Sequence, residues 1–434
     1  MRALVRALAV SWAIAGVTAV AAAQEAGGAA QHVPVPARLT LDEALRIAEA
    51  HSPAITAAAA SLQIAEADAI AARQHPNPVF AASSEGLPFS QDPRQPFWDN
   101  QQLTLTVEQD LETGGRRGLR DRAAGTGIDA ARAAARDRTR RLRLDVQRAY
   151  LHAVLAKADH EVAQATLADI DRVLAINRAR FEQGELSGVE LRRLQVERHR
   201  FADDLLTVDL GLNNAHAALL AVMHVRPLDQ AFDTAASLGD PVTEPARGEA
   251  AMEQAIAARP DLVALRGEQA RAQIESALQR AIGKPIWTIG GGYQRNFGVN
   301  ALVLLARVPL PLASRNQGGI GRADAGQKLA DAATEAATTE AALEIQLASN
   351  GVAAHRARVD AVQREYLRNA REARDIVLAA SRAGAATLID FLDAQRTLDE
   401  AQRVENRALF DYRVSICQLE SALGPGAAGG ASPR

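Results

Sequence analysis

The chain has 434 residues, enough for two or three ordinary domains, and a formal net charge of −3. Hydrophobic residues make up 48% of it and aromatic residues only 4%. Many strong helix formers with few aromatic residues favour long helices that pack through small side chains. This slightly negative net charge does not indicate nucleic-acid binding. After the N-terminus, no stretch of about 20 apolar residues predicts a transmembrane helix.

The N-terminus has the pattern of an export signal. Arg2 and Arg6 precede an apolar core, and Ala21-Ala22-Ala23 fits a small-residue cleavage site before Gln24. A short buried helix is the alternative interpretation. An exported chain without a membrane helix is secreted, periplasmic, or inserted in the outer membrane as a β-barrel.

Residue types that support catalysis or metal binding are sparse. Cys417 is the single cysteine, which excludes an intramolecular disulfide and a cysteine metal cluster. The nine histidines are scattered without metal-ligand spacing. No phosphate-binding loop or nucleophile elbow occurs. We therefore predict no catalytic residues, no metal site and no cofactor, and hence no enzyme.

An internal repeat organises the whole sequence. Ser52-Pro53 recurs as Arg259-Pro260, Leu103 recurs as Leu302 at an offset of 199, and Gly184 recurs as Gly384 at an offset of 200. Each copy predicts a helix, two strands, a very long helix and a return helix. The predicted segments are a signal peptide (1–23), a linker (24–38), the first repeat (39–225), a connecting segment (226–247), the second repeat (248–423) and a flexible tail (424–434).

The strands are expected in two hairpins, near residues 78–112 and 285–312. In the first hairpin, Leu103 and Leu105 alternate with Thr104, Thr106 and Glu108. In the second, Leu302 and Leu304 lie on the opposite face from Arg307. Such alternation over about 9–11 residues is typical of a membrane barrel, in which the leucines face lipid and Glu108 and Arg307 the lumen. A sheet of a soluble protein with one solvent-exposed face gives the same alternation.

Aromatic residues strengthen the membrane interpretation because they gather in the hairpins, as interfacial girdles require. They are Phe80, Phe89, Phe97, Trp98, Trp287, Tyr293 and Phe297. Four strands are too few to close a barrel, since the smallest single-chain barrels have about eight. A barrel therefore requires an oligomer.

The helices between the hairpins are free of proline from Pro96 to Pro227 and from Pro311 to Pro425. Residues 116–182 predict one helix of about 67 residues, about 100 Å long. The return helix carries two heptad stripes, interrupted only at Arg198, and Glu405 interrupts the corresponding stripe of the second repeat. Two antiparallel coiled-coil hairpins are expected.

Three local motifs resemble the TolC family of outer-membrane efflux factors. They are the strand-to-helix junctions Asp110–Arg117 and Pro309–Gly318, and the helix-tip segment Gly384–Gln395. The amino-acid sequences of the two junctions most resemble those of the CzcC-like cation-efflux branch. Arg116, Arg117 and Arg315 are expected near lipid headgroups, and solvated arginines at helix starts are the alternative interpretation.

The resemblance implies a mainly α protein with a small β part: a long coiled-coil helical barrel joined to a trimeric twelve-stranded outer-membrane β-barrel. It implies an outer-membrane location with helices extending into the periplasm. The homotrimer would conduct substrates, by the branch metal cations, to the exterior. Its partners would be a periplasmic adaptor, an inner-membrane pump of the RND type and outer-membrane lipid, with no nucleic acid.

The resemblance also assigns roles to residues at the helix tips. The periplasmic gate would be formed by Asp390, Asp393 and Glu190, and the adaptor contacts by Gly184, Ser187, Gly384 and Thr387. A solvated helix face is the alternative for Asp390 and Asp393. The sequence departs from the family at Ala386, where a basic gate residue is expected, and Arg192 and Arg193 could substitute for it. Other functions in the same class are drug efflux and type I protein secretion. A periplasmic adaptor and a secreted coiled-coil protein are alternatives from other classes.

Overall fold

The structure is a computed structural model that describes residues 33–86, 101–296, 298–383 and 385–424. The predicted signal peptide and most of the predicted linker lie outside the described residues. So do Gly384, all but the first residue of the predicted tail, and the aromatic residues Phe89, Phe97, Trp98 and Phe297.

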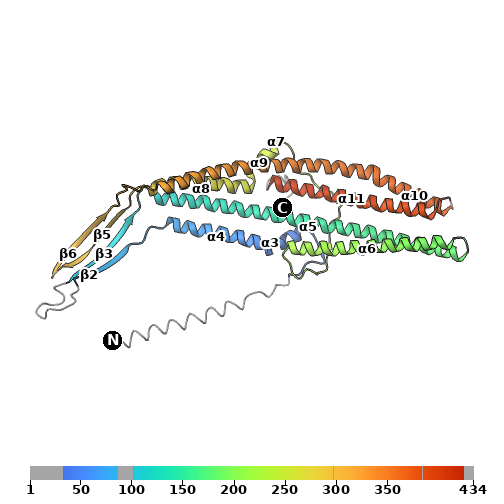
Figure 1. Cartoon of the computed structure of the whole chain (residues 1–434), viewed down its shortest axis with the longest axis horizontal. Helices are drawn as coiled ribbons and strands as arrows, with labels where there is room; N and C mark the ends of the chain where they lie inside the picture. The colour runs from blue at the N-terminus through green and yellow to red at the C-terminus, as the bar shows by residue number, and fades with distance from the viewer. Residues whose placement is uncertain (1–32, 87–100, 297, 384, 425–434) are drawn as a thin grey trace, which may run out of the picture. The chain divides into compact units, whose positions relative to one another are not determined.

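Long helices form most of the described chain, and four strands form one sheet (Figure 1). The first repeat contains β1 (Arg38–Leu39), α3 (Leu41–His51), α4 (Pro53–Arg73), β2 (Val79–Glu85), β3 (Gln102–Leu111), α5 (Arg116–Glu182) and α6 (Gly188–Val222). After β4 (Asp233–Thr234), the second repeat contains α7 (Glu249–Ala258), α8 (Pro260–Ile282), β5 (Trp287–Asn296), β6 (Val299–Arg307), α9 (Gln317–Ala361), the π-helical turn η2 (Val362–Leu367), α10 (Arg368–Arg382) and α11 (Leu388–Leu423). In both parts of the chain, two helices precede two strands, and long helices follow them.

The chain divides into two compact units, and each contains parts of both repeats. Unit 1 comprises residues 1–52, 145–242 and 355–414, and unit 2 comprises residues 53–144, 243–354 and 415–434. The sheet lies in unit 2, and both helix tips lie in unit 1.

The longest helix, α5, has the predicted bounds and 67 residues. It begins after Gly114 and Gly115, whose φ angles are +73° and +72°. It ends before Gly184, whose φ angle is +80°. Left-handed backbone is available to glycine at little cost, so these glycines let the chain turn sharply at both ends of a helix that no proline interrupts.

The sheet of unit 2 is antiparallel, with the strand order β2-β3-β5-β6. The central pair, β3 and β5, joins the two repeats directly. Gly292 allows β3 and β5 to approach closely, because a Cβ atom there would lie 1.9 Å from the carbonyl oxygen of Leu105. Gly290 and Gly292 are therefore required by the packing of the sheet, whereas Gly291 leaves room for a Cβ atom.

Arg116 has a different role from the one predicted. Its side chain is buried rather than available to lipid, and it donates hydrogen bonds to Ala281 O at 3.1 Å, Ile282 O at 3.0 Å and Lys284 O. The last carbonyl groups of a helix have no partner within the helix. Arg116 satisfies them at the end of α8, so burial of its charge is compensated.

In unit 1, the connecting segment contributes a short strand that the sequence did not predict. β1 and β4 pair in parallel, with Leu39 opposite Thr234. The buried hydroxyl of Tyr150 on α5 donates to Leu39 O at 3.0 Å and accepts from Ala236 N at 3.2 Å. This hydroxyl links the first residues of the first repeat, α5 and the connecting segment.

The second long helix contains a π-helical turn that was not predicted. In η2 the hydrogen bonds run from i to i+5, so residues five apart share a face. Val362 and Leu367 are five apart and both are buried. The turn therefore keeps two apolar side chains on the packed side.

Among the described residues, α6 is the one helix long and apolar enough to cross a membrane by length and composition. The sequence did not predict this, because the apolar residues of α6 are distributed around the helix rather than in one run. The same helix carries Asp204, which forms an ion pair with Arg403 of α11.

Candidate functional site

The sheet separates its side chains into an apolar and a polar face. Residues opposite each other in an antiparallel ladder point to the same face. The register places Leu105 with Tyr293 and Leu302, and Glu108 with Gly290 and Leu305. The apolar face includes Phe80, Leu103, Leu105, Val107, Leu111, Trp287, Ile289, Tyr293, Leu302 and Leu304. Its polar members include Gln109, Arg295 and Asn300, and the last two lie in line with Leu103 near the end of the sheet away from the helices. The polar face includes Thr104, Thr106, Glu108, Thr288, Gln294 and Arg307.

The apolar face is uncovered within the protomer. Leu302 and Leu304 are 78% and 79% exposed, and Phe80 is 66% exposed. Such a large exposed apolar surface marks contact with a membrane or a partner. The alternation predicted from the sequence places the predicted residues on opposite faces, as expected.

The two predicted lumen residues are brought together on the polar face. The Arg307 guanidinium lies 3.0 Å from the Glu108 carboxylate. Thr288 donates a hydrogen bond to Asp110 at 2.6 Å on the same face. Polar groups on this face therefore satisfy one another across the strands.

At the first helix tip, the predicted residues form the start of α6. Ser187 N donates to the Glu190 carboxylate at 3.2 Å, and Glu190 N donates to the Ser187 hydroxyl at 3.3 Å. This reciprocal pair is a capping box, which satisfies two of the unpaired N–H groups of a helix start. Gly184, with its positive φ, forms the preceding turn.

At the second tip, the corresponding residues form the start of α11 in the same way. The Asp390 carboxylate accepts from Thr387 N at 2.8 Å and from the Thr387 hydroxyl at 2.7 Å. These two hydrogen bonds stabilise the charged carboxylate and hold the pKa of Asp390 below its usual range. Gly384 lies outside the described residues. Both tips thus place a carboxylate at a helix start through an N-cap bond.

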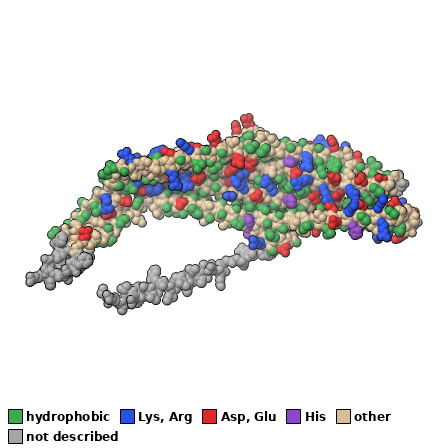
Figure 2. All heavy atoms as spheres, viewed as in Figure 1, with side chains coloured by type: hydrophobic (Ala, Val, Ile, Leu, Met, Phe, Trp, Pro, Cys, Tyr) green, Lys and Arg blue, Asp and Glu red, His purple; other side chains and the backbone are tan. Residues whose placement is uncertain are grey.

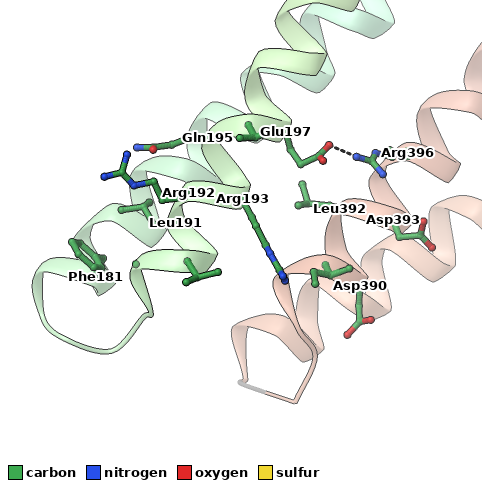
Figure 3. Close-up of a pocket in the computed structure, with 14 residues that line it drawn as sticks. Phe181, Leu191, Arg192, Arg193, Gln195, Glu197, Asp390, Leu392, Asp393 and Arg396 are labelled. Carbon is green, nitrogen blue, oxygen red and sulfur yellow. Dashed lines mark hydrogen bonds and ion pairs between the residues drawn. The ribbon is translucent and has the colours of Figure 1, made fainter.

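Asp393 differs from the other two predicted gate residues because its carboxylate caps nothing. It is exposed in the first turns of α11. Figure 3 shows it projecting away from α6, whereas Asp390 points toward the turn that precedes α11. Residues three apart share a helix face, but the hydrogen bonds from Thr387 hold the Asp390 side chain against the turn that precedes α11.

A groove of about 1140 Å³ lies between α6 and α11 at the tips. Arg192, Arg193 and Leu191 line it from α6, and Leu392 and Arg396 from α11. Figure 3 shows Arg193 extending toward α11. Neither Arg192 nor Arg193 forms an ion pair within the described part of the chain, so their substitution for the basic residue missing at Ala386 stays a prediction.

Ion pairs that the sequence did not predict connect α6 to α11. Glu197 pairs with Arg396 (Figure 3), and Asp204 pairs with Arg403. The two pairs are one heptad apart on both helices. The sequence does show opposite charges at heptad spacing on the two return helices. It does not show that α6 contacts α11, and without that contact the charges cannot be assigned to ion pairs.

The polar interruptions of the heptad stripes have partners. Arg198 on α6 lies 2.6 Å from Asp171 on α5. Glu405 on α11 accepts from Gln363 of η2 at 2.9 Å. Each interruption is thus a polar contact between helices that otherwise pack through apolar side chains, such as Ile170, Leu194 and Phe391.

Two carboxylates are partly buried between α5 and α11. Burial raises the pKa of Asp159, although a hydrogen bond from Asn406 at 2.9 Å opposes the shift. Burial likewise raises the pKa of Asp399, which accepts from Thr166 at 3.0 Å. Arg403 lies 3.1 Å from Asp399 and supplies the compensating positive charge.

The raised pKa of Asp159 predicts a pH-dependent stability. The folded state favours the protonated carboxyl, so its charge costs stability at neutral pH. This cost begins to decrease as the pH falls to the folded-state pKa and is absent below the pKa of the unfolded state. We expect Asp159→Asn to raise the apparent melting temperature at pH 7 and to leave it unchanged in acid, as measured by circular dichroism. The exposed Asp203→Asn is the matched control. A lower melting temperature for Asp159→Asn at pH 7 would contradict this account.

The described residues contain no group of three or more His, Cys, Asp or Glu side chains placed to hold a metal ion. The features that remain are a sheet divided into two faces and two capped helix tips joined by long coiled coils. Together they define the protomer of a membrane channel. Figure 2 shows positive and negative side chains interspersed over the helices.

The chain matches the family described as Outer membrane efflux protein over residues 44–223 and 251–425. It is 25% identical over 367 residues to the cobalt-zinc-cadmium resistance protein CzcC of Cupriavidus metallidurans, covering 84% of this chain and 85% of that protein. It is also 25% identical over 298 residues to the outer membrane protein TolC of Vibrio cholerae, covering 65% and 67%. The crystal structure of VceC from Vibrio cholerae shares the fold, with a TM-score of 0.71, 22% identity and coverage of 89% and 96%.

The chain therefore belongs to the outer membrane efflux protein family. It is an efflux channel of the outer membrane, of the kind that works in tripartite systems, and its helices extend into the periplasm. The family resemblance drawn from the junction and tip motifs is confirmed.

Proposed function

We propose that three copies of this chain assemble into a channel that conducts metal cations from the periplasm to the exterior, without a catalytic step. The observation that carries the proposal is the sheet with one apolar face and two edges, β2 and β6, that pair with no other described strand. Open edges do not occur in the hydrocarbon region of a membrane. Four strands cannot close on themselves, so the edges of neighbouring copies must pair into a twelve-stranded barrel.

In this barrel, the apolar face contacts lipid and the polar face lines the lumen. The alternative orientation would expose Arg307 and Glu108 to hydrocarbon, which is costly for charged groups. Their ion pair on the lumen side leaves that wall without net charge from these two residues. Glu108 and Arg307 therefore shape the lumen rather than select the charge of the substrate.

The helix tips form the periplasmic end. Threefold symmetry would turn Asp390, Asp393 and Glu190 each into a ring of three carboxylates. Rings of like charge in a confined space concentrate cations. Gly184, Ser187, Gly384 and Thr387 are the residues that we assign to the contact with a periplasmic adaptor, with a pump of the RND type beyond it.

Metal cations are the substrate class that fits these carboxylates. The relative named for cobalt, zinc and cadmium resistance, which aligns along most of both chains, supports the same class. Drug efflux and type I protein secretion use ducts of the same fold and are the competing outcomes.

The test is a deletion of the gene, followed by measurement of growth inhibition by cobalt, zinc, cadmium and a lipophilic drug. We expect tolerance to at least one of the metals to fall and to be restored by the intact gene, while drug tolerance stays the same throughout. Loss of drug tolerance alone would contradict the cation assignment. Light scattering of the purified protein in detergent tests the trimer separately.

A further inference from the structure

We infer that the junction between the sheet and the helices is a binding surface for anionic phospholipid headgroups, formed by Arg117, Lys284 and Arg315 beside Trp287, Leu310 and Leu312. This surface is called the junction collar below. The inference rests on the proposed lipid-facing side of the sheet. It goes beyond that proposal because it assigns a lipid class and the residues that select it.

Contacts within unit 2 bring the three segments of the collar together. Leu111 at the end of β3 lies opposite Trp287 at the start of β5. The Thr113 hydroxyl donates to Pro285 O at 2.5 Å. The third segment follows β6, and it is held against α8 because Asn316 Nδ2 donates to Gln279 O at 2.8 Å.

The glycines at the junction show how closely these segments pack. A Cβ atom on Gly114 would lie 3.1 Å from the Lys284 side chain, and one on Gly283 would lie 2.6 Å from Arg315 O. The Lys284 side chain thus packs against Gly114, and the Arg315 backbone packs against Gly283. The collar is a fixed feature of the fold and not a set of independent loops.

The three cations of the collar are exposed, and none has a carboxylate partner within the described residues. Arg117 contacts only the imidazole of His75, and the Arg315 guanidinium donates to Pro311 O at 3.2 Å. Two neighbouring ion pairs are formed, Glu112 with Arg120 and Arg280 with Asp324. The Asp110 carboxylate lies on the polar face of the sheet and accepts from the Thr288 hydroxyl.

Exposed apolar side chains lie beside these cations. Leu310 and Leu312 are 73% and 83% exposed, and Trp287 is 48% exposed on the apolar face of the sheet. In Figure 2, hydrophobic side chains follow the sheet, and Lys and Arg side chains lie over the adjoining helix ends. Going from the sheet toward the helices, apolar side chains come first, then tryptophan, then Lys and Arg. This order matches the layers of a membrane surface, from acyl chains to headgroups.

The chemistry of the collar favours anionic over zwitterionic lipid. Each Lys or Arg near an anionic membrane surface contributes about 1 kcal/mol of attraction, or about fivefold in binding. Salt screens such contacts when they are exposed. Since no carboxylate competes for the three cations, a phosphodiester carrying net negative charge is the partner that they fit.

The experiment uses Trp287 as a local probe. Among the protein's three tryptophans, Trp12 lies in the predicted signal peptide, so Trp98→Phe leaves Trp287 as the sole tryptophan of the processed chain. The purified variant is reconstituted into vesicles that mix phosphatidylcholine with phosphatidylglycerol, with bromine on the acyl chains of one lipid at a time. Fluorescence quenching then reports which lipid occupies positions next to Trp287.

We expect about a fivefold preference for phosphatidylglycerol at low ionic strength, falling as salt is added. The triple change Arg117→Gln, Lys284→Gln and Arg315→Gln should abolish the preference. The matched control, Arg178→Gln, Arg368→Gln and Arg371→Gln, removes three exposed cations of unit 1 and should retain it. If the triple variant does not assemble, Lys284→Gln alone should reduce the preference.

Two results would overturn the inference in different ways. Equal quenching by both brominated lipids would show that the collar does not select headgroups, while leaving the sheet in the bilayer. Absence of quenching by either lipid would show that Trp287 does not face lipid, and would overturn the proposed orientation of the sheet as well.

Discussion

Replacing Leu105 with lysine should sharply reduce the amount of assembled trimer in the outer membrane. Leu105 lies in the middle of β3, on the apolar face, opposite Ala82 and Tyr293. A lysine facing lipid near the membrane midplane costs about 2–4 kcal/mol per protomer. A trimer carries this cost three times. The measurement is the fraction of trimer in outer-membrane extracts, resolved by semi-native electrophoresis.

The matched control is Thr104→Lys, one residue away on the polar face. Thr104 is only partly buried, whereas Thr106 is almost fully buried and would add a packing cost. Thr104→Lys should assemble normally and alter conductance. Equal losses of trimer from the two variants would refute the assignment of the faces.

Neutralising the second helix tip should reduce the cation selectivity of the open channel by about tenfold, because fields of this kind raise local ion concentrations by 10-fold or more. The change is Asp390→Asn with Asp393→Asn. Asparagine keeps an oxygen that can accept the Thr387 hydrogen bonds, so the start of α11 is retained. Block by divalent cations should weaken in the same single-channel recordings, because fewer carboxylates remain to bridge them.

A control variant that loses two carboxylates elsewhere shows whether the change in selectivity comes from the helix tip or from the lower net charge. Asp203→Asn with Glu372→Gln removes two exposed carboxylates from α6 and α10, away from the tips. It should leave selectivity unchanged. Recordings of the Asp390 and Asp393 variant that match wild type would mean that both aspartates are solvated outside the pore, and Glu190 would then be the remaining candidate.

Local rules explain why so much of the fold was predictable. The absence of proline and the positive-φ glycines at Gly114 and Gly184 set the bounds of α5, since both features act within a few residues. Strand alternation likewise gave the two faces of the sheet, because side-chain direction in a strand depends only on position along it.

Features that depend on partners distant in sequence were not predictable. The role of Arg116 follows from the place where α8 ends, 166 residues further along the chain. The pairing of β1 with β4 and the pairs Glu197–Arg396 and Asp204–Arg403 also require contacts that no local pattern encodes. At the tips, the sequence predicted the gate carboxylates, but not that Glu190 and Asp390 would serve as caps while Asp393 stays free.

The π-helical turn η2 bears on the direction in which the second helix tip faces. α5 runs as one α-helix of 67 residues, whereas its counterpart is divided into α9, η2 and α10, with 45, 6 and 15 residues. Each residue of an α-helix advances the chain by about 100° around the axis, since a turn takes about 3.6 residues. The wider π turn advances it by less per residue. η2 therefore changes the face that α10 presents relative to α9, and with it the direction of every side chain between the turn and the tip.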